Sequence, residues 1–394
     1  MPSDRIAQIL NIEEIFLAIL SLLPCHQLYR TALVSKRWKM TAQEIMNQVL
    51  HISSTNLELA RSYARKNDSA YKKLKVNLDT GYFQSLLILT AMDKAAVEKL
   101  RTLELYTSIA EISPSWNETA STFPIQIRDL LPSIATLVLH PIHSRLFEEM
   151  VLSFENIVSL TLYTPLEETI EWHMVELNQL TDLTVVAPKG NKTFLQFVDR
   201  YVVAPRLQSL ILSIDLAANS AYIRRIVTTY SGTLTHLRIV GTKDDCVFTQ
   251  GLYICPLRPL KHLQELTIET CFLPILLHSI PHPDGRSPFP SLQTLVLEER
   301  WSSIIHAMET YNWTDIRSIL DHHHATNSML KICCGYTGAE VQGQGYREEV
   351  IRLLIGGGNG AMSYNVEQVK CCGIVPYRRP AESRNGWGSG TSSW

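Results

Sequence analysis

The sequence has no excess of charge of either sign and no long hydrophobic run. Its 394 residues carry 36 Lys and Arg against 38 Asp and Glu, which gives a formal net charge of −2. This balance indicates neither a nucleic-acid-binding nor a membrane-binding surface. No stretch approaches the roughly 20 apolar residues that span a bilayer, and Glu13 and Glu14 interrupt the first apolar segment, unlike a secretory signal. We therefore expect a cytoplasmic or nuclear protein.

Motifs for metal binding and catalysis are also missing. The eight cysteines lack C-x-x-C spacing, and adjacent pairs such as Cys333–Cys334 and Cys371–Cys372 are poor zinc ligands. The consecutive His322–His324 would point about 100° apart on a helix and could not converge on one ion. No H-E-x-x-H, G-x-S-x-G or P-loop motif occurs. The sequence predicts no metal, no cofactor and no catalytic residue, and therefore a protein that is not an enzyme.

An apolar-x-x-apolar-x-apolar pattern recurs along the middle of the chain. Its copies begin 23 to 34 residues apart, a period typical of repeat proteins. The eight clear copies are Leu100/Leu103/Leu105, Ile134/Leu137/Leu139, Ile157/Leu160/Leu162, Leu180/Leu183/Val185, Leu207/Leu210/Leu212, Leu234/Leu237/Ile239, Leu263/Leu266/Ile268 and Leu292/Leu295/Leu297. Weaker copies are predicted at Tyr71/Leu74/Val76 and around Leu330/Ile332. The alternation at the end of each copy predicts a short, half-buried strand.

Between these strands the apolar spacing becomes helical. Residues 146–154, 194–202 and 223–230 each place apolar side chains three and four positions apart, as on an amphipathic helix. Gly232 follows the third of these segments, where a left-handed residue often ends a helix. A strand backed by a helix cannot bury its apolar face alone, so neighbouring units must stack. The expected fold is an α/β solenoid, a horseshoe of parallel strands backed by helices.

The pattern resembles the leucine-rich-repeat family over roughly residues 71 to 333. Cys271 fits the position where that family usually has Asn or Cys, whereas Pro165 and Pro188 depart from it. We expect the solenoid to occupy residues 51–370, with the clearest repeats at 100–300. Residues 371–394 are rich in Gly and Ser, a composition typical of a disordered tail.

The first 50 residues predict a separate all-α module. An apolar stripe from Ile12 to Leu23 has helical spacing and stops at Pro24, and a second apolar stretch runs from Leu28 to Trp38. Leu20–Pro24 and Val34–Trp38 resemble an F-box, although Glu13 stands where that family usually has an opening proline. This order of an F-box before leucine-rich repeats is common in the F-box/leucine-rich-repeat family.

The resemblance implies a substrate-recognition subunit of an SCF-type ubiquitin ligase, which binds a Skp-type adaptor and through it a cullin. The family resemblance implies that seven residues bind the adaptor or support that interface: Ile12, Ile15, Leu20, Pro24, Leu28, Val34 and Trp38. The main alternative is a repeat scaffold without a role in ubiquitin transfer, in which residues 1–50 are a helical cap. An enzyme of unrecognised type is a third hypothesis.

Strand alternation predicts which residues face the concave surface of the solenoid and could bind a protein target. The predicted binding residues are Tyr106, His140, Tyr163, Arg238, Glu269 and Glu298. The first three fall in consecutive repeats and predict an aromatic row, a feature of recognition surfaces. Glu104 and Thr267 are also expected to face solvent there. The alternative is an ordinary solvated sheet face, and the sequence leaves both open.

Overall fold

A computed structural model describes the central part of the chain. The described residues are 48–53, 56–64, 71–80, 82–107, 122–165, 172–187, 192–214, 216–241, 260–269, 289–299 and 331–336. The predicted N-terminal module, with Ile12 to Trp38, lies outside them, as does the predicted tail.

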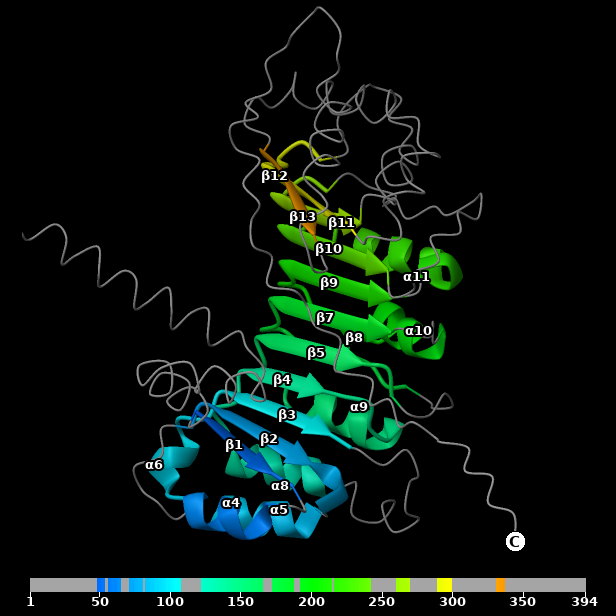
Figure 1. Ribbon diagram of the computed structural model, residues 1–394. Coiled ribbons are helices and arrows are strands. Elements are labelled where there is room, and N and C mark those ends of the chain that lie inside the picture. Colours follow the sequence, from blue (N-terminus) through cyan, green and yellow to red (C-terminus); the bar gives the residue numbers. More distant parts are fainter. Residues whose placement is uncertain are drawn as a thin grey trace, which may run out of the picture.

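A single parallel sheet organises the described residues, and its strands follow one another in chain order (Figure 1). Eleven described strands make up this sheet: β1 (Val49–Ile52), β2 (Lys73–Asn77), β3 (Thr102–Tyr106), β4 (Thr136–Leu139), β5 (Ser159–Tyr163), β7 (Asp182–Ala187), β9 (Ser209–Ile214), β10 (His236–Gly241), β11 (Glu265–Glu269), β12 (Thr294–Glu299) and β13 (Lys331–Tyr336). The order confirms the predicted α/β stack of repeats, in which each strand pairs with the next one.

The register of the sheet aligns the apolar positions of the repeat. Leu103 pairs with Leu137, Leu137 with Leu160, and Leu160 with Leu183, and these side chains are at most 1% exposed. Both weak copies form strands, β2 and β13, in the same sheet. A strand that we did not predict, β1, precedes them and pairs Leu50 with Leu74.

A tight turn precedes most strands of the main sheet and adds an apolar position that the six-residue pattern did not include. The amide of Leu207 donates to the Ala204 carbonyl at 3.1 Å, and the amide of Leu180 donates to that of Leu177 at 3.1 Å. Ala204 and Leu177 are buried, as is Leu131 in the corresponding turn. The repeat thus contains a further apolar residue three positions earlier, which closes the turn and fills the space beneath it.

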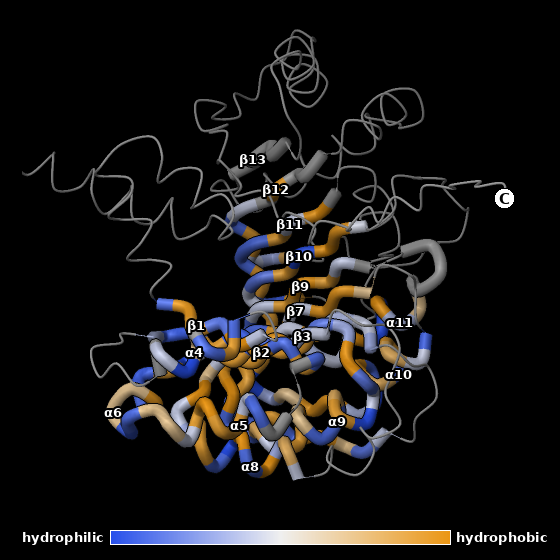
Figure 2. The backbone as a smooth tube through the Cα atoms, turned by 60° about the horizontal axis from the view of Figure 1, so that its bottom comes forward, coloured by the Kyte–Doolittle hydropathy of each residue, from blue (hydrophilic) through white to orange (hydrophobic). Residues whose placement is uncertain are grey.

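Helices cover one face of the sheet, and the apolar segments of helices and strands meet between the two layers (Figure 2). The described helices are α4 (Leu57–Ala64), α5 (Tyr82–Thr90), α6 (Lys94–Val97), α8 (Phe123–Leu130), α9 (Ser144–Ser153), α10 (Lys192–Arg200) and α11 (Leu216–Thr229), with a 3-10 turn at Leu78–Thr80. None of these described helices is long and apolar enough to cross a membrane.

The helix ends differ from two of our expectations. The segment predicted as helical to residue 202 ends at Arg200, because Val202–Val203 forms strand β8 and pairs with β6 (Val175–Glu176). Gly232 does not have the positive φ of a left-handed cap. Instead, the Ser231 hydroxyl donates to the Thr228 carbonyl at 2.8 Å, and satisfies one of the acceptors left at the end of α11.

Aromatic side chains fill the core where the sheet meets α9 and α10. Phe147, Phe194 and Phe197 are fully buried, and Phe147 makes edge-on ring contacts with both of the others. Trp172, just before β6, packs on Phe197 with ring centroids 4.3 Å apart. These contacts fix the helical layer against the middle strands.

Candidate binding surface

The face of the sheet opposite the described helices is called the front face here. In each strand its residues alternate with the buried apolar ones, as in β5, where Ser159, Thr161 and Tyr163 are half-buried and Leu160 and Leu162 are fully buried. Because the strands are parallel and in register, equivalent residues of successive repeats form rows across this face. The predicted binding residues occupy two of these rows.

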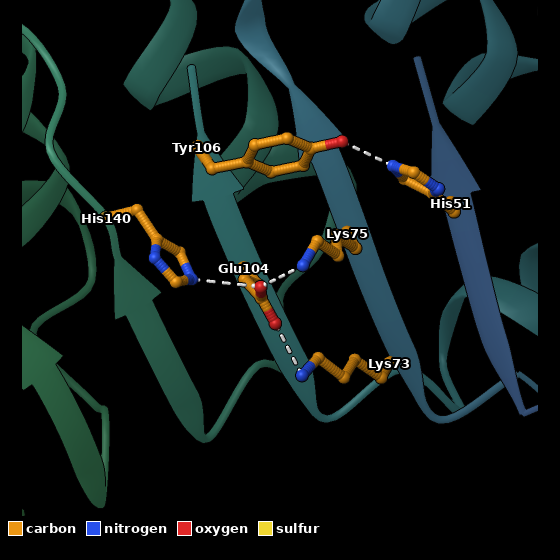
Figure 3. Close-up of polar contacts among 6 residues, drawn as sticks. All are labelled: His51, Lys73, Lys75, Glu104, Tyr106 and His140. Atoms are coloured by element: carbon orange, nitrogen blue, oxygen red, sulfur yellow. Dashed lines mark hydrogen bonds and ion pairs between the residues drawn. The ribbon is translucent and has the colours of Figure 1, made fainter. Parts of the chain in front are cut away.

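A carboxylate shared by three partners lies near the N-terminal end of the front face (Figure 3). Glu104, in β3, accepts ion pairs from the ammonium groups of Lys73 at 2.5 Å and Lys75 at 2.6 Å, both in β2. On its other side, His140 Nε2 lies 3.0 Å from Glu104 Oε1 and can donate a hydrogen bond to it. The Glu104 side chain is only 8% exposed, so our expectation that it faces solvent is wrong. Long neighbouring side chains cover it.

These partners control the charge of Glu104. Burial alone would raise the pKa of this carboxyl, because desolvation disfavours the charged form. The hydrogen bond with His140 and the positive charges of Lys73 and Lys75 outweigh burial and hold the pKa well below its usual range. Glu104 is therefore a carboxylate at neutral pH. Thr267, the other front-face residue expected to face solvent, is also buried.

Aromatic and imidazole rings form a row beside Glu104. His140, immediately after β4, stacks on Tyr163 with centroids 4.5 Å apart and planes 15° apart. On its other side His140 meets Tyr106 edge-on at 6.3 Å. Tyr106 hydrogen bonds through its hydroxyl to Nε2 of His51, in β1, at 2.5 Å (Figure 3). The structure thus brings together the three rings that we predicted as an aromatic row and adds His51 to them; their role in binding stays a prediction.

The positive charge of Lys75 acts on this ring row as well. The Lys75 ammonium lies 4.8 Å from the ring centroid of Tyr106, within the range of a cation–π contact. Burial and the charge of Lys75 lower the pKa of His51 from its ordinary value, against a smaller opposite effect of Glu104. Burial likewise raises the pKa of Tyr106. Both groups are neutral at pH 7, so the positive charge at this end of the front face comes from the lysines.

The six predicted target-binding residues lie in two groups. Tyr106, His140 and Tyr163 are adjacent, on β3 to β5. Arg238 lies on β10, and Glu269 and Glu298 are register partners on β11 and β12. Strands β7 and β9 separate the two groups. The sheet therefore does not gather all six at one place.

Sequence reasoning missed His51, Lys73 and Lys75. Lys75 occupies the position between Leu74 and Val76 in a weak copy of the repeat, where the alternation rule already predicts a front-face residue. The repeat that contains His51 has Asn47 at the position where the pattern requires its first apolar residue. The pattern therefore did not identify this repeat. Among the residues that the structure describes, no group of His, Cys, Asp and Glu is arranged to hold a metal ion.

One comparison with known proteins bears on the N-terminal segment. No curated protein matches the chain. A family model described as F-box-like matches residues 13–46, which end three residues before β1 begins at Val49. The matched segment includes six of the seven predicted adaptor-binding residues and the whole Val34–Trp38 block, and leaves out Ile12. The chain thus carries an F-box-like segment directly before a long stack of parallel strands and helices.

Proposed function

We propose that the chain is a substrate-recruiting subunit of an SCF-type ubiquitin ligase, with residues 1–50 as the adaptor-binding module and the repeats as the target-binding surface. The observation that carries the proposal is the F-box-like match at residues 13–46 immediately before the repeat sheet. F-box proteins are typically non-catalytic subunits, so the chemistry of ubiquitin transfer belongs to other components of the ligase.

The adaptor-binding part of the proposal rests on the small size of the module and on its apolar residues. A module of about 40 residues buries too little surface to be stable without a partner or a neighbouring domain. Pro24, Leu28, Val34 and Trp38 then contact a Skp-type adaptor, while Ile12, Ile15 and Leu20 hold the module's helices together. The adaptor in turn connects the chain to a cullin.

The target-binding part of the proposal assigns the front face to a protein substrate. A row of side chains held by stacking and ion pairs is preorganised, which lowers the entropy lost on binding. Tyr106, His140 and Tyr163 supply ring surfaces of the kind that concentrate binding energy at interfaces. Arg238, Glu269 and Glu298 extend this surface towards the C-terminal strands.

Adaptor binding tests the proposal directly. The purified full-length chain is mixed with a purified Skp-type adaptor, and binding is compared with that of a Val34→Asp, Trp38→Ala double variant. Val158→Asp is a matched control, because it introduces the same charge at a valine that is 41% exposed and lies just before β5. Circular dichroism and thermal unfolding establish that all three proteins are folded.

We expect the wild type and Val158→Asp to bind the adaptor and the double variant to lose at least tenfold in affinity. If the folded wild type does not bind, the ubiquitin-ligase proposal is wrong. That result would favour the alternative of a repeat scaffold capped by residues 1–50, which the replacement of the usual proline by Glu13 also favours.

A further inference from the structure

At one place on the front face, two lysines share a single carboxylate and leave a net positive charge. Glu104 is shared by the ammonium groups of Lys73 and Lys75, at 2.5 and 2.6 Å. One carboxylate cannot balance two ammonium groups, so a residual charge of +1 remains. The two lysine side chains are 37% and 35% exposed, whereas that of Glu104 is 8% exposed. An approaching molecule therefore meets the lysines and not the carboxylate.

Two front-face rows of the strands that follow contain no Asp, Glu, Lys or Arg, whereas the third row carries one carboxylate, Asp182 on β7. We call these two rows the central panel; their residues are Val138, His140, Thr161, Tyr163, Thr184, Val186, Ile211 and Ser213. Val138, Thr161, Thr184 and Ile211 lie in one row and are β-branched and half-buried. Covering such a surface removes few charged groups from water, so its desolvation costs little. Depletion of charge and enrichment in aromatic rings are typical of the core of a protein interface.

We propose that the front face binds an extended target segment that places an Asp or Glu carboxylate against Lys73 and Lys75 and an aromatic or aliphatic side chain on the His140–Tyr163 stack. This inference rests on the proposed function only in treating the front face as the target-binding surface. The residual charge of +1 matches a carboxylate, whereas a phosphate group carries close to two negative charges at neutral pH.

The spacing of the strands sets the spacing of the two anchors in the target. Lys75 lies on β2 and Tyr163 on β5, three strand intervals away. At about 4.8 Å per interval the anchors are about 14 Å apart. An extended chain advances about 3.3 Å per residue, so the acidic and apolar residues of the target are about four positions apart.

The test is a selection of random twelve-residue peptides displayed against the purified full-length chain. We expect selected peptides to carry Asp or Glu three to five positions from Tyr, Phe, Leu or Ile. Fluorescence anisotropy then measures the affinity of the chain for three forms of a selected peptide: the peptide itself, its Asp→Asn or Glu→Gln form, and a form with phosphoserine at that position. We expect the amide form to bind about three- to tenfold more weakly at low salt and this difference to shrink at high salt. The phosphoserine form is expected to bind no more tightly than the carboxylate form.

Protein variants locate the bound carboxylate. Lys73→Gln, Lys75→Gln and Glu104→Gln combined remove all three charges without leaving a buried one unpaired. In this triple variant we expect the acidic peptide and its amide form to bind equally. Lys94→Gln with Lys99→Gln is the matched control, because both lysines are exposed and lie in or just after α6. This control should retain the preference for the acidic peptide.

Three results would overturn the inference. They are a selection that returns no peptides with the acidic–apolar pattern, an amide form that binds as tightly as its parent, and a phosphoserine form that binds clearly more tightly. The peptide substitutions remain informative even if the triple variant does not fold. The peptide experiments contain no adaptor and are independent of adaptor binding. If the peptide experiments fail while the chain binds the adaptor, the proposed target chemistry is rejected and the proposed function stands.

Discussion

Glu104 shows how a single residue on the front face is controlled by three neighbouring strands. Its partners are Lys73 and Lys75 from the preceding strand and His140 from the end of the following one. Each contact is ordinary by itself, but together they bury a carboxylate and keep it charged. Such a group stabilises the fold only while its partners remain in place, because an unpaired buried charge is costly.

We expect Glu104→Gln to lower the free energy of unfolding by about 1 to 3 kcal/mol at pH 7, the usual cost of losing hydrogen bonds to charged groups. The pKa of Glu104 in the folded protein lies well below its ordinary value of 4.5. Its contribution is therefore fully present above about pH 4.5 and is lost as the pH falls below that value.

Urea unfolding of the wild type and of Glu104→Gln at pH 7, 5.5 and 4 tests this expectation. The difference between the two proteins should be constant at the first two values and smaller at the third. Glu176→Gln, at an exposed position in β6, is the matched control and should have little effect at any pH. A Glu104→Gln variant as stable as the wild type at pH 7 would show that the cluster contributes nothing to the fold.

At the scale of elements, each strand of the main sheet from β1 to β11 has one side made of buried Leu, Ile or Val residues and the other made of front-face residues. The strand is short, four to six residues in the main sheet, so two buried side chains hold most of it in place. In β5 these are Leu160 and Leu162, both fully buried. Helices such as α5 differ, because one of their leucines remains largely outside: Leu87 is 42% exposed.

We expect Leu160→Ala to lower the free energy of unfolding by about 2 to 5 kcal/mol, because it opens a cavity in a closely packed interior. The same substitution at Leu87 should cost less than about 1 kcal/mol. Chemical unfolding of both variants measures the two values. Similar costs at the two positions would contradict the assignment of Leu160 to the core.

At the scale of the whole molecule, the sheet is a stack in which each repeat contacts its neighbours. The carbonyl of Thr181 accepts hydrogen bonds from the amides of Gln208 and Ser209, both at 2.9 Å, and the carbonyl of Gln208 accepts from the next repeat in the same way. These bonds join adjacent repeats and no others. Stability is therefore expected to spread along the stack through nearest-neighbour contacts.

We expect Leu183→Asp, in the middle strand β7, to raise amide hydrogen exchange most in β5, β7 and β9 and least in β1 and β2. Leu183 is 1% exposed, so the new charge cannot be accommodated without opening the local core. Exchange followed by mass spectrometry of peptides resolves the strands. Val158→Asp is the control and should leave the pattern unchanged. An equal rise in every strand would show that the described repeats unfold as one unit.

The sequence by itself determined the period of the repeat, the strands of the main sheet from β2 to β13, and the amphipathic segments that form α9, α10 and α11. These features follow from positions close together in the chain, where a leucine two or three residues from the next defines the buried side of a strand. The same alternation placed Tyr106, His140 and Tyr163 on one face. The sequence also indicated the F-box-like segment, because the signal of that segment is a short contiguous motif.

Only the tertiary structure decided which front-face residues meet. The contacts of Glu104 with Lys73 and His140 join residues 31 and 36 positions apart, and depend on the register of three strands. Whether long side chains cover a carboxylate depends on their lengths and directions, which the alternation rule does not contain. For this reason the sequence placed Glu104 on the correct face but exposed to water, and the structure buries it under two lysines.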